Sequence, residues 1–399
     1  MIDILFFVYI GIVAGVAAGL IPGIHPNLLA LLAGSVLMSM NFFPSILCFI
    51  SFMVSMGITN SITSFIPSIL LGAPDPESSL SVLPGHRLLM KGYGYHAIKL
   101  TVIGGLGAVI ICLSILPVVI LTIPTIYNLI RPNLHIILSV VMIYLTILER
   151  KRITAFVCFL LAGFIGIYGS RLPINQNFYL FPVLSGLFGL PMLLLTIKNK
   201  TNIPKQEKKE MFTSVKTINR SVLIGSLAGL ITGLLPGIGS AQATVLASIG
   251  QKKDEQGFLI SVGAITTANI LFSFLAIWLI GNPRSGIAVV IQQFAEISFN
   301  EFLFMLFISL ISCGVAVILT LKISRLLIDF IQKVNYILIS KSVFLLICVL
   351  VFVFTGFYGL FLTFITTCLG IFVNLVGVNR YQLMGVLLLP TILFFANAI

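Results

Sequence analysis

The chain has very little charge for its length. Only 9% of its 399 residues are Asp, Glu, Lys or Arg, 59% are hydrophobic, and the mean hydropathy is +1.17. Soluble domains carry far more charge, and apolar runs of about twenty residues recur along this chain. The composition therefore excludes an ordinary soluble enzyme or binding domain. It predicts an all-α polytopic membrane protein, because helices satisfy their own backbone groups in lipid.

The sequence also lacks the motifs on which common catalytic and metal sites depend. Its four histidines show no metal-ligand spacing, and it contains neither a Gly-x-Ser-x-Gly turn nor a phosphate-binding loop. None of the six cysteines belongs to a Cys-x-x-Cys pair, so we expect them to be packing residues. An intramembrane enzyme that uses His25 with Asp75 or His86 remains a minor alternative. We expect no enzyme activity, no cofactor and no metal centre.

Acidic residues are few, and none of the eleven lies at the centre of an apolar segment. Proton-coupled carriers usually bury an Asp or Glu in the membrane. Coupling to sodium through carbonyl groups, hydroxyls and Asn amides therefore fits this sequence better, and uncoupled transport is the other alternative. The net charge of +12 comes from basic residues scattered between apolar segments, so nucleic acid is not an expected partner.

A glycine-lined apolar segment that ends in Pro-Gly occurs twice. The first copy, GIVAGVAAGLIPGI, spans 11–24, and the second, GSLAGLITGLLPGI, spans 225–238, at an offset of 214. Small residues at every fourth position let a helix pack closely against a neighbour. Pro-Gly removes an amide donor and permits unusual backbone angles, so each helix should end there. Such a break inside an apolar run is tolerated only where it is buried in protein or lines a wet cavity.

Further matches predict an internal repeat. The pattern Asn-x-x-x-Ser-Phe at 60–65 recurs at 269–274, and Gly-x-Pro at 72–74 recurs at 281–283, both at an offset of 209. Near the ends of the halves, Phe181-Pro182 aligns with Leu389-Pro390 at an offset of 208. The resulting domain prediction has three parts: a first transmembrane repeat (1–197), a basic cytoplasmic linker (198–220) and a second transmembrane repeat (221–399).

The basic residues predict the orientation in the plasma membrane. With the linker in the cytoplasm, every Lys and Arg lies inside except Arg131, Arg171 and Arg284. This requires 3–40 and 221–250 to enter and leave on one side each, as helical hairpins with Pro-Gly at their tips. The two hairpins then come from opposite faces. The fold prediction is two inverted-topology repeats, each with one hairpin and about five further transmembrane helices, and with both termini extracytoplasmic.

Polar residues follow both tips, at the start of a new helix. Two helix N-termini aimed at the membrane midplane favour a negative charge, and transporters with inverted repeats bind their substrates at such an interface. The candidate substrate-binding residues of the tips are Pro22, Gly23, His25, Asn27, Pro236, Gly237, Gly239 and Ser240. The alternative is that both Pro-Gly pairs are simple tight turns between spanning helices.

Asn60 and Asn269 lie in the middle of otherwise apolar segments, near Ser64 and Ser273. A buried amide needs partners, which here are the substrate, a sodium ion, the hairpin backbone or a neighbouring helix; the sequence leaves these open. These four residues complete the predicted binding site together with Arg284. Arg284 either draws anions in from outside or anchors a helix end.

The motifs resemble a known family. The segments GLIPGI, IPSILLGAPDPESSLSVLPGHRLLMKGYG, GLLPGIGS, ANILFSF and GNP, in this order, are similar to the large membrane subunit of tripartite tricarboxylate transporters. The resemblance implies uptake of carboxylate anions with a small membrane subunit and an extracytoplasmic binding protein. It points to Pro22, Gly23, Asn60, Pro236, Gly237 and Asn269. Residues 83–87, LPGHR, depart from the usual Leu-Asp-Gly-Tyr-Pro, and the chain is closer to a shorter, mostly archaeal branch.

The sequence thus predicts a secondary transporter for a small organic anion of the di- or tricarboxylate kind, bound between the hairpin tips near the midplane. The alternative is a translocase for polyprenyl-phosphate lipid carriers, because a similar Pro-Gly plan occurs in such proteins. A helix-dipole site would accept a phosphate head group as readily as a carboxylate.

Overall fold

The computed structural model describes residues 2–21, 29–30, 33–34, 42–71, 82–174, 179–198, 204–207, 211–234, 240, 243–244, 247, 254–333 and 336–396. Within these ranges every regular element is a helix, which confirms the all-α prediction. Nine helical segments in this part of the chain are long and apolar enough to cross a membrane. They are α1 (Ile2–Leu20), α3 with α4 (Ile46–Thr63, Phe65–Leu70), α6 (Gly94–Ile130), α8 (Arg152–Gly169), α9 to α10 (Leu180–Leu184, Leu190–Lys198), α11 (Val215–Leu234), α13 (Glu255–Ile280), α15 (Phe299–Ile331) and α16 (Tyr336–Val376).

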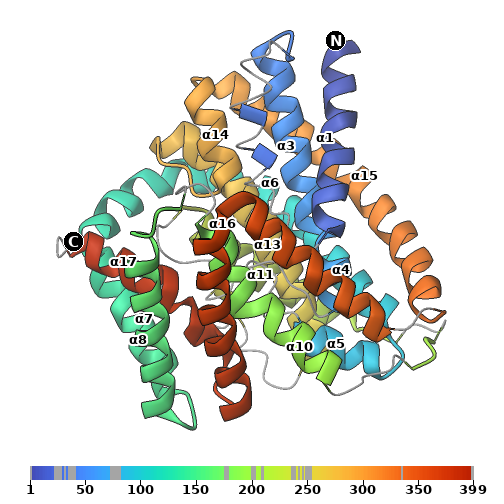
Figure 1. Ribbon diagram of the computed structural model, residues 1–399. Coiled ribbons are helices and arrows are strands. Elements are labelled where there is room, and N and C mark those ends of the chain that lie inside the picture. The colour runs from blue at the N-terminus through green and yellow to red at the C-terminus, as the bar shows by residue number, and fades with distance from the viewer. Residues whose placement is uncertain are drawn as a thin grey trace.

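Shorter helices connect these segments. They are α5 (Val82–Met90), η2 (Arg131–Asn133), α7 (Leu134–Ile147), the π-helical η3 (Ser185–Gly189), α14 (Gly286–Phe294), η4 (Arg380–Met384) and α17 (Gly385–Phe395). Helix α16 bends sharply near its middle (Figure 1), where Gly356 has a φ of 64° that interrupts the helix. Helix α3 ends at Thr63 because Pro67 cannot donate a hydrogen bond back to its carbonyl.

The helices form two bundles, and each bundle contains both halves of the chain. One apolar core joins α1, α3, α6, α13, α14 and α15, while a second joins α7, α8, η3, α16, η4 and α17. Figure 1 shows α7, α8 and α17 on one side of the molecule and α1, α3 and α15 on the other. Helix α6 packs on α13 and α15 packs on α3, so each half places a long helix on the other half.

The helices that carry the two Asn motifs lie at the centre of the first bundle. In the α3–α4 segment and in α13, 89% of the residues in an apolar stretch of 18 residues are buried, whereas the fraction is 22% in α6 and 17% in α16. The outer helices therefore present most of their apolar surface to lipid. Asn60 and Asn269 lie on the two helices that are most enclosed by protein.

The glycine-lined helices α1 and α11 pack in the same way on these central helices. A Cβ atom placed on Gly15 would lie 2.5 Å from the carbonyl oxygen of Met56, and one on Gly229 would lie 2.8 Å from that of Ile265. The glycines are 214 residues apart and their partners 209 residues apart, the two offsets found in the sequence. Only residues without a side chain permit this backbone approach.

The match of Phe181-Pro182 with Leu389-Pro390 is wrong. Gly166 approaches the side chain of Pro390, and Gly370 makes the same approach to Pro191. Pro390 therefore corresponds to Pro191, at an offset of 199 rather than 208. The offset falls because the connection from α8 to α9 is longer than the one from α16 to η4.

In each half, the start of the predicted hairpin segment lies beside the helix or residue that follows the segment in the chain. The ring of Phe7 in α1 lies 5.0 Å from that of Phe43, which precedes α3. In the second half, Ser261 Oγ at the start of α13 donates to the carbonyl oxygen of Ser221 at 2.9 Å. The Pro-Gly tips, at 22–23 and 236–237, lie outside the described residues.

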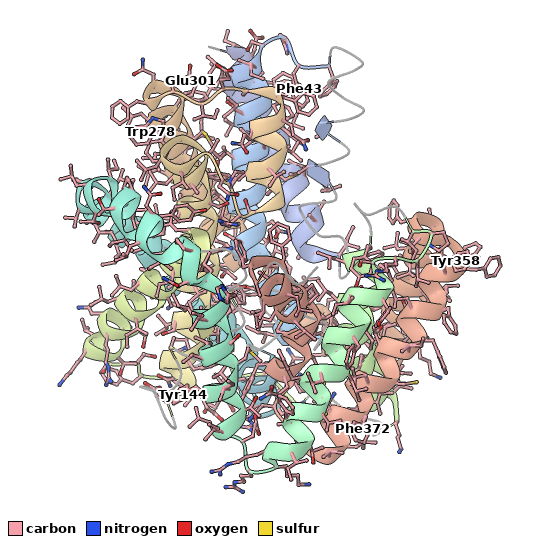
Figure 2. The ribbon with its side chains drawn as sticks, turned by 90° about the vertical axis from the view of Figure 1, so that its left-hand side faces the viewer. Phe43, Tyr144, Trp278, Glu301, Tyr358 and Phe372 are labelled. Atoms are coloured by element: carbon pink, nitrogen blue, oxygen red, sulfur yellow. The ribbon has the colours of Figure 1, made fainter. Side chains whose placement is uncertain are left out.

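Residues predicted to share a side of the membrane lie together. Lys91 Nζ is 3.0 Å from Glu255 Oε2, and the linker residue Gln206 accepts from the amide of Gly94 at 2.9 Å. Phe43, Trp278 and Glu301 lie at one end of the molecule and Tyr144 and Phe372 at the other (Figure 2). The N-terminus lies at the first of these ends (Figure 1). Which end faces the cytoplasm stays a prediction.

Candidate functional site

Ser273 lies in α13, about two helical turns before its end, and contacts the chain that doubles back after this helix. Its Oγ accepts hydrogen bonds from the amides of Arg284 and Ser285, at 3.0 and 2.7 Å. Helix α13 itself continues to Ile280, and Gly281, with a φ of 67°, ends it in the left-handed conformation. The segment after Gly281 therefore runs back along α13 by about two helical turns. This reversal places Ser285, the residue that precedes α14, beside Ser273.

Arg284 connects this reversal to the end of α11. Its Nε donates to the carbonyl oxygen of Leu234 at 3.3 Å, and its Nη2 donates to the hydroxyl of Tyr127 at 3.2 Å. A positive charge at the C-terminus of a helix interacts favourably with the helix dipole. Leu234 is the last described residue before the second Pro-Gly pair, which itself lies outside the described residues.

Tyr127 was missed by the sequence reasoning. It is a buried residue near the end of α6, and its hydroxyl also accepts from Asn282 Nδ2 at 3.1 Å. Tyr127 belongs to the first half, while Asn282 and Arg284 belong to the second. A single Tyr near the end of a long apolar helix carries no sequence signal of such a contact.

The last turn of α11 packs directly on the Ser273 region. A Cβ on Gly233 would lie 3.2 Å from the amide nitrogen of Ser273 and 2.8 Å from the carbonyl oxygen of Asn269. Beyond the tip, Ser240 is buried, and its carbonyl oxygen accepts from Thr244 Oγ1 at 2.7 Å. The structure thus places Asn269 and Ser273 along the helix on which α11 packs, and Arg284 at the end of α11.

The first half offers polar groups that have no partner among the described residues. Asn60 is 4% exposed, yet its Nδ2 makes no hydrogen bond, and neither does the Oγ1 of neighbouring Thr59. A buried donor without an acceptor costs about 1–3 kcal/mol. The amide of Ser64, where α3 breaks, donates to the carbonyl oxygen of Asn60 at 3.0 Å. The unpaired Asn60 amide calls for an acceptor, and a ligand oxygen would supply one.

The two helices that carry Asn60 and Asn269 touch one another. Ser61 Oγ lies 3.4 Å from Thr267 Oγ1, within hydrogen-bond range, and both hydroxyls are buried. Ser61 directly follows Asn60, and Thr267 precedes Asn269 by two residues. The predicted residues of the two halves therefore lie on either side of one contact at the repeat interface.

Several predicted residues cannot be placed. Those at the tips (Pro22, Gly23, His25, Asn27, Pro236, Gly237 and Gly239) lie outside the described residues, as does Asp75. The residues that remain offer the unpaired Asn60 amide and the Arg284 guanidinium, while the hydroxyls of Ser61 and Thr267 bond to one another. Hydrogen-bond donors and a positive charge are the groups that recognise carboxylate or phosphate oxygens.

Nine apolar helices in the described part of the chain, with helices as its regular elements, define a polytopic membrane protein. The chain belongs to the tripartite tricarboxylate transporter TctA family, which it matches over residues 5–385. It is also 33% identical over 359 residues to an uncharacterized protein of Methanocaldococcus jannaschii, a match that covers 87% of this chain and 88% of the relative. No solved structure matches the chain.

Membership of this family makes the protein a secondary transporter and not an enzyme, which removes the intramembrane-enzyme alternative. Proteins of the family work with a binding protein and a small membrane subunit in tripartite transporters. The relative in M. jannaschii is consistent with the archaeal branch that the sequence motifs indicate.

Proposed function

We propose that this protein carries a small anion of the di- or tricarboxylate kind across the cell membrane and binds it between the two hairpin tips near the midplane. The observation that carries the proposal is the Ser61–Thr267 contact, with an unpaired Asn60 amide on one side and the Ser273–Arg284 reversal on the other. Each half then supplies part of one binding site.

The chemistry of these groups favours an anion as the ligand. The free group on Asn60 is an N–H donor, which a carboxylate oxygen satisfies and a metal ion does not. Arg284 adds a positive charge at the end of α11. A carboxylate with two oxygens fits such a set of donors, because charge-assisted hydrogen bonds are the stronger kind.

Sodium coupling is the second part of the proposal. Thr59 Oγ1 is a buried oxygen without a partner among the described residues, next to Asn60 and opposite Gly15 of α1. Hydroxyl and carbonyl oxygens of this kind suit sodium, and a cation beside the site would offset the negative charge of the anion. We further propose that the small membrane subunit and an extracytoplasmic binding protein deliver the anion.

The proposal is tested with the purified full chain in proteoliposomes. We expect uptake of labelled succinate or citrate under an inward sodium gradient, and slower uptake when potassium replaces sodium. Asn60→Val should abolish uptake, because it removes the donor and keeps the volume similar. Ser312→Ala serves as the matched control, since Ser312 is a buried hydroxyl of α15 that also has no partner in the described part of the chain.

A parallel assay measures translocation of a fluorescent polyprenyl phosphate in the same vesicles. Carboxylate uptake that is lost in Asn60→Val and kept in Ser312→Ala supports the proposal. Translocation of the lipid without carboxylate uptake would contradict it and favour the lipid-carrier alternative.

A further inference from the structure

Arg380 is the only Lys or Arg that is buried among the described side chains. It is the first residue of η4, in the second bundle, and is 6% exposed. Its guanidinium lies between α10 of the first half and the end of α16 of the second half, since it contacts Met192 and Asn374. This location is again an interface between the two halves, at some distance along the chain from the hairpin motifs.

The hydrogen bonds of Arg380 leave most of its donors unused. Nε donates to Asn374 Oδ1 at 2.8 Å, Nη2 donates to the sulfur of Met192, and Nη1 has no partner. Sulfur is a weak acceptor, so one oxygen atom serves a group with five N–H bonds. A buried charge without an opposite charge is strongly unfavourable.

No carboxylate of the described residues pairs with Arg380. Both ion pairs in this part of the chain involve Glu255, on α13. Glu149 is buried in the second bundle, but it accepts from Asn379 Nδ2 at 2.5 Å and lies against the hydroxyl of Tyr381. Arg380 therefore has no ion-pair partner among the described carboxylates.

A second polar side chain of η4 is also buried. Gln382 is fully buried, and its side chain lies against the hydroxyl of Tyr381, although neither its Oε1 nor its Nε2 makes a hydrogen bond of standard geometry. By the offset of 199, Phe181 of the first half corresponds to Arg380 in the sequence, and Val183 corresponds to Gln382. Apolar residues fill the same positions there, so the packing of the fold does not need polar groups at these sites.

We propose that η4 is an anion-binding element, in which Arg380 binds a carboxylate group of the transported solute at a second site, separate from the site between the tips. The inference rests on the proposed function, because it takes the solute to be a carboxylate. Arg380 follows the lower end of α16, the end at which Phe372 and Tyr144 lie (Figure 2). Positive-inside counting assigns this end to the cytoplasm. The second site then receives the anion on the cytoplasmic side before release.

The test is titration of the purified full chain with citrate and with succinate by calorimetry, together with melting temperatures without anion. Arg380→Gln should weaken the binding that depends on Arg380 by about tenfold or more, since it removes charge-assisted hydrogen bonds. Its melting temperature without anion should stay unchanged or rise, because an unpaired buried charge is gone. Gln382→Val, which introduces the first-half residue, should likewise not lower it.

Arg171→Gln is the matched control, because Arg171 is exposed and lies over the ring of Tyr168 at 5.6 Å. This variant should bind the anions as the wild type does. Unchanged affinity in Arg380→Gln would overturn the inference, and a fall in its anion-free melting temperature with unchanged affinity would assign Arg380 a structural role only.

Arg380→Lys decides the question if Arg380→Gln does not fold. Lys keeps the charge but lacks the planar fork, so affinity should fall several-fold; wild-type affinity would overturn the inference. Asn60→Val separates the two proposals, because it should stop uptake while Arg380-dependent binding persists. If Asn60→Val loses all anion binding and Arg380→Gln binds the anions as the wild type does, the second site is overturned and the proposed function stands. Arg380-dependent binding of inorganic phosphate without any carboxylate binding would overturn the carboxylate assignment in both.

Discussion

The Nε of Arg284 donates to the carbonyl oxygen of Leu234 at 3.3 Å. These residues are fifty positions apart, and their contact fixes the end of α11 against the reversal that follows α13. Arg284 therefore both satisfies a terminal helix carbonyl and keeps a positive charge at the end of α11. Anchoring a helix end and attracting an anion, which the sequence leaves as alternatives, are compatible in this geometry.

Replacing Arg284 should affect transport more than folding. Arg284→Gln removes the charge and the hydrogen bonds to Leu234 and Tyr127, which together stabilise by about 1.5–3 kcal/mol at most, because the side chain is only half-buried. We expect a small fall in melting temperature and at least a tenfold loss of carboxylate uptake in proteoliposomes. Uptake at the wild-type rate in this variant would show that the charge has no part in transport.

The glycine packing predicts opposite effects of the same substitution at different sites. Gly15→Ala and Gly229→Ala place a methyl group against backbone carbonyls and should destabilise by about 1–3 kcal/mol. Gly314→Ala in α15 meets no atom within 4 Å and should stabilise by about 0.5–1 kcal/mol. Melting temperatures of the three purified variants check this. Equal effects at all three positions would contradict the close approach of α1 to α3 and of α11 to α13.

His86 should make stability sensitive to acid. Burial lowers the pKa of His86 below 6.5, although a hydrogen bond to the backbone of Ile69 opposes the shift; α5, which carries it, is not a membrane-spanning segment. As the pH falls below about 6.5, the unfolded chain binds a proton that the folded chain does not, so the folded state loses stability down to the lowered pKa. Melting temperatures between pH 7.5 and 5 should fall less in His86→Gln than in the wild type. Parallel curves would contradict this assignment.

The inverted topology predicts which cysteines a membrane-impermeant reagent reaches. In a background without the six native cysteines, Phe212→Cys in the linker should react only from the cytoplasm, and Ile2→Cys only from outside; both positions are highly exposed. Labelling of intact cells and of inverted vesicles measures this. A cytoplasmic residue 2 would contradict the inverted repeat.

The sequence predicted the packing of the repeats where the pattern is local. The offsets of 214 and 209 reappear in the contacts of Gly15 and Gly229, because glycine spacing determines which helix face can approach a neighbour. The ends of the two halves were aligned wrongly, because Pro182 and Pro191 are both possible matches for Pro390 and the connecting segments differ in length between the halves. Pro191 was therefore missed as the counterpart of Pro390.

Long-range polar contacts were not predictable in the same way. Tyr127 reaches Arg284 across 157 residues, and positive-inside counting placed Arg380 on the cytoplasmic side without indicating that it is buried. Charge counting gives the side of the membrane on which a residue lies but not its burial. Burial depends on which helices enclose the residue, and single-sequence patterns do not specify this.

The central claim is that one anion lies between the two halves, and protection of cysteines by the substrate tests it most directly. Ser61→Cys and Thr267→Cys, which keep Asn60 and Asn269 in place, are each labelled with a small thiol reagent, with and without citrate or succinate, in the background without native cysteines. Ser312→Cys serves as the control position. The account predicts that the same carboxylate slows labelling at residues 61 and 267, where the two helices meet, and not at 312. Labelling at residues 61 and 267 at rates that no carboxylate changes would contradict it.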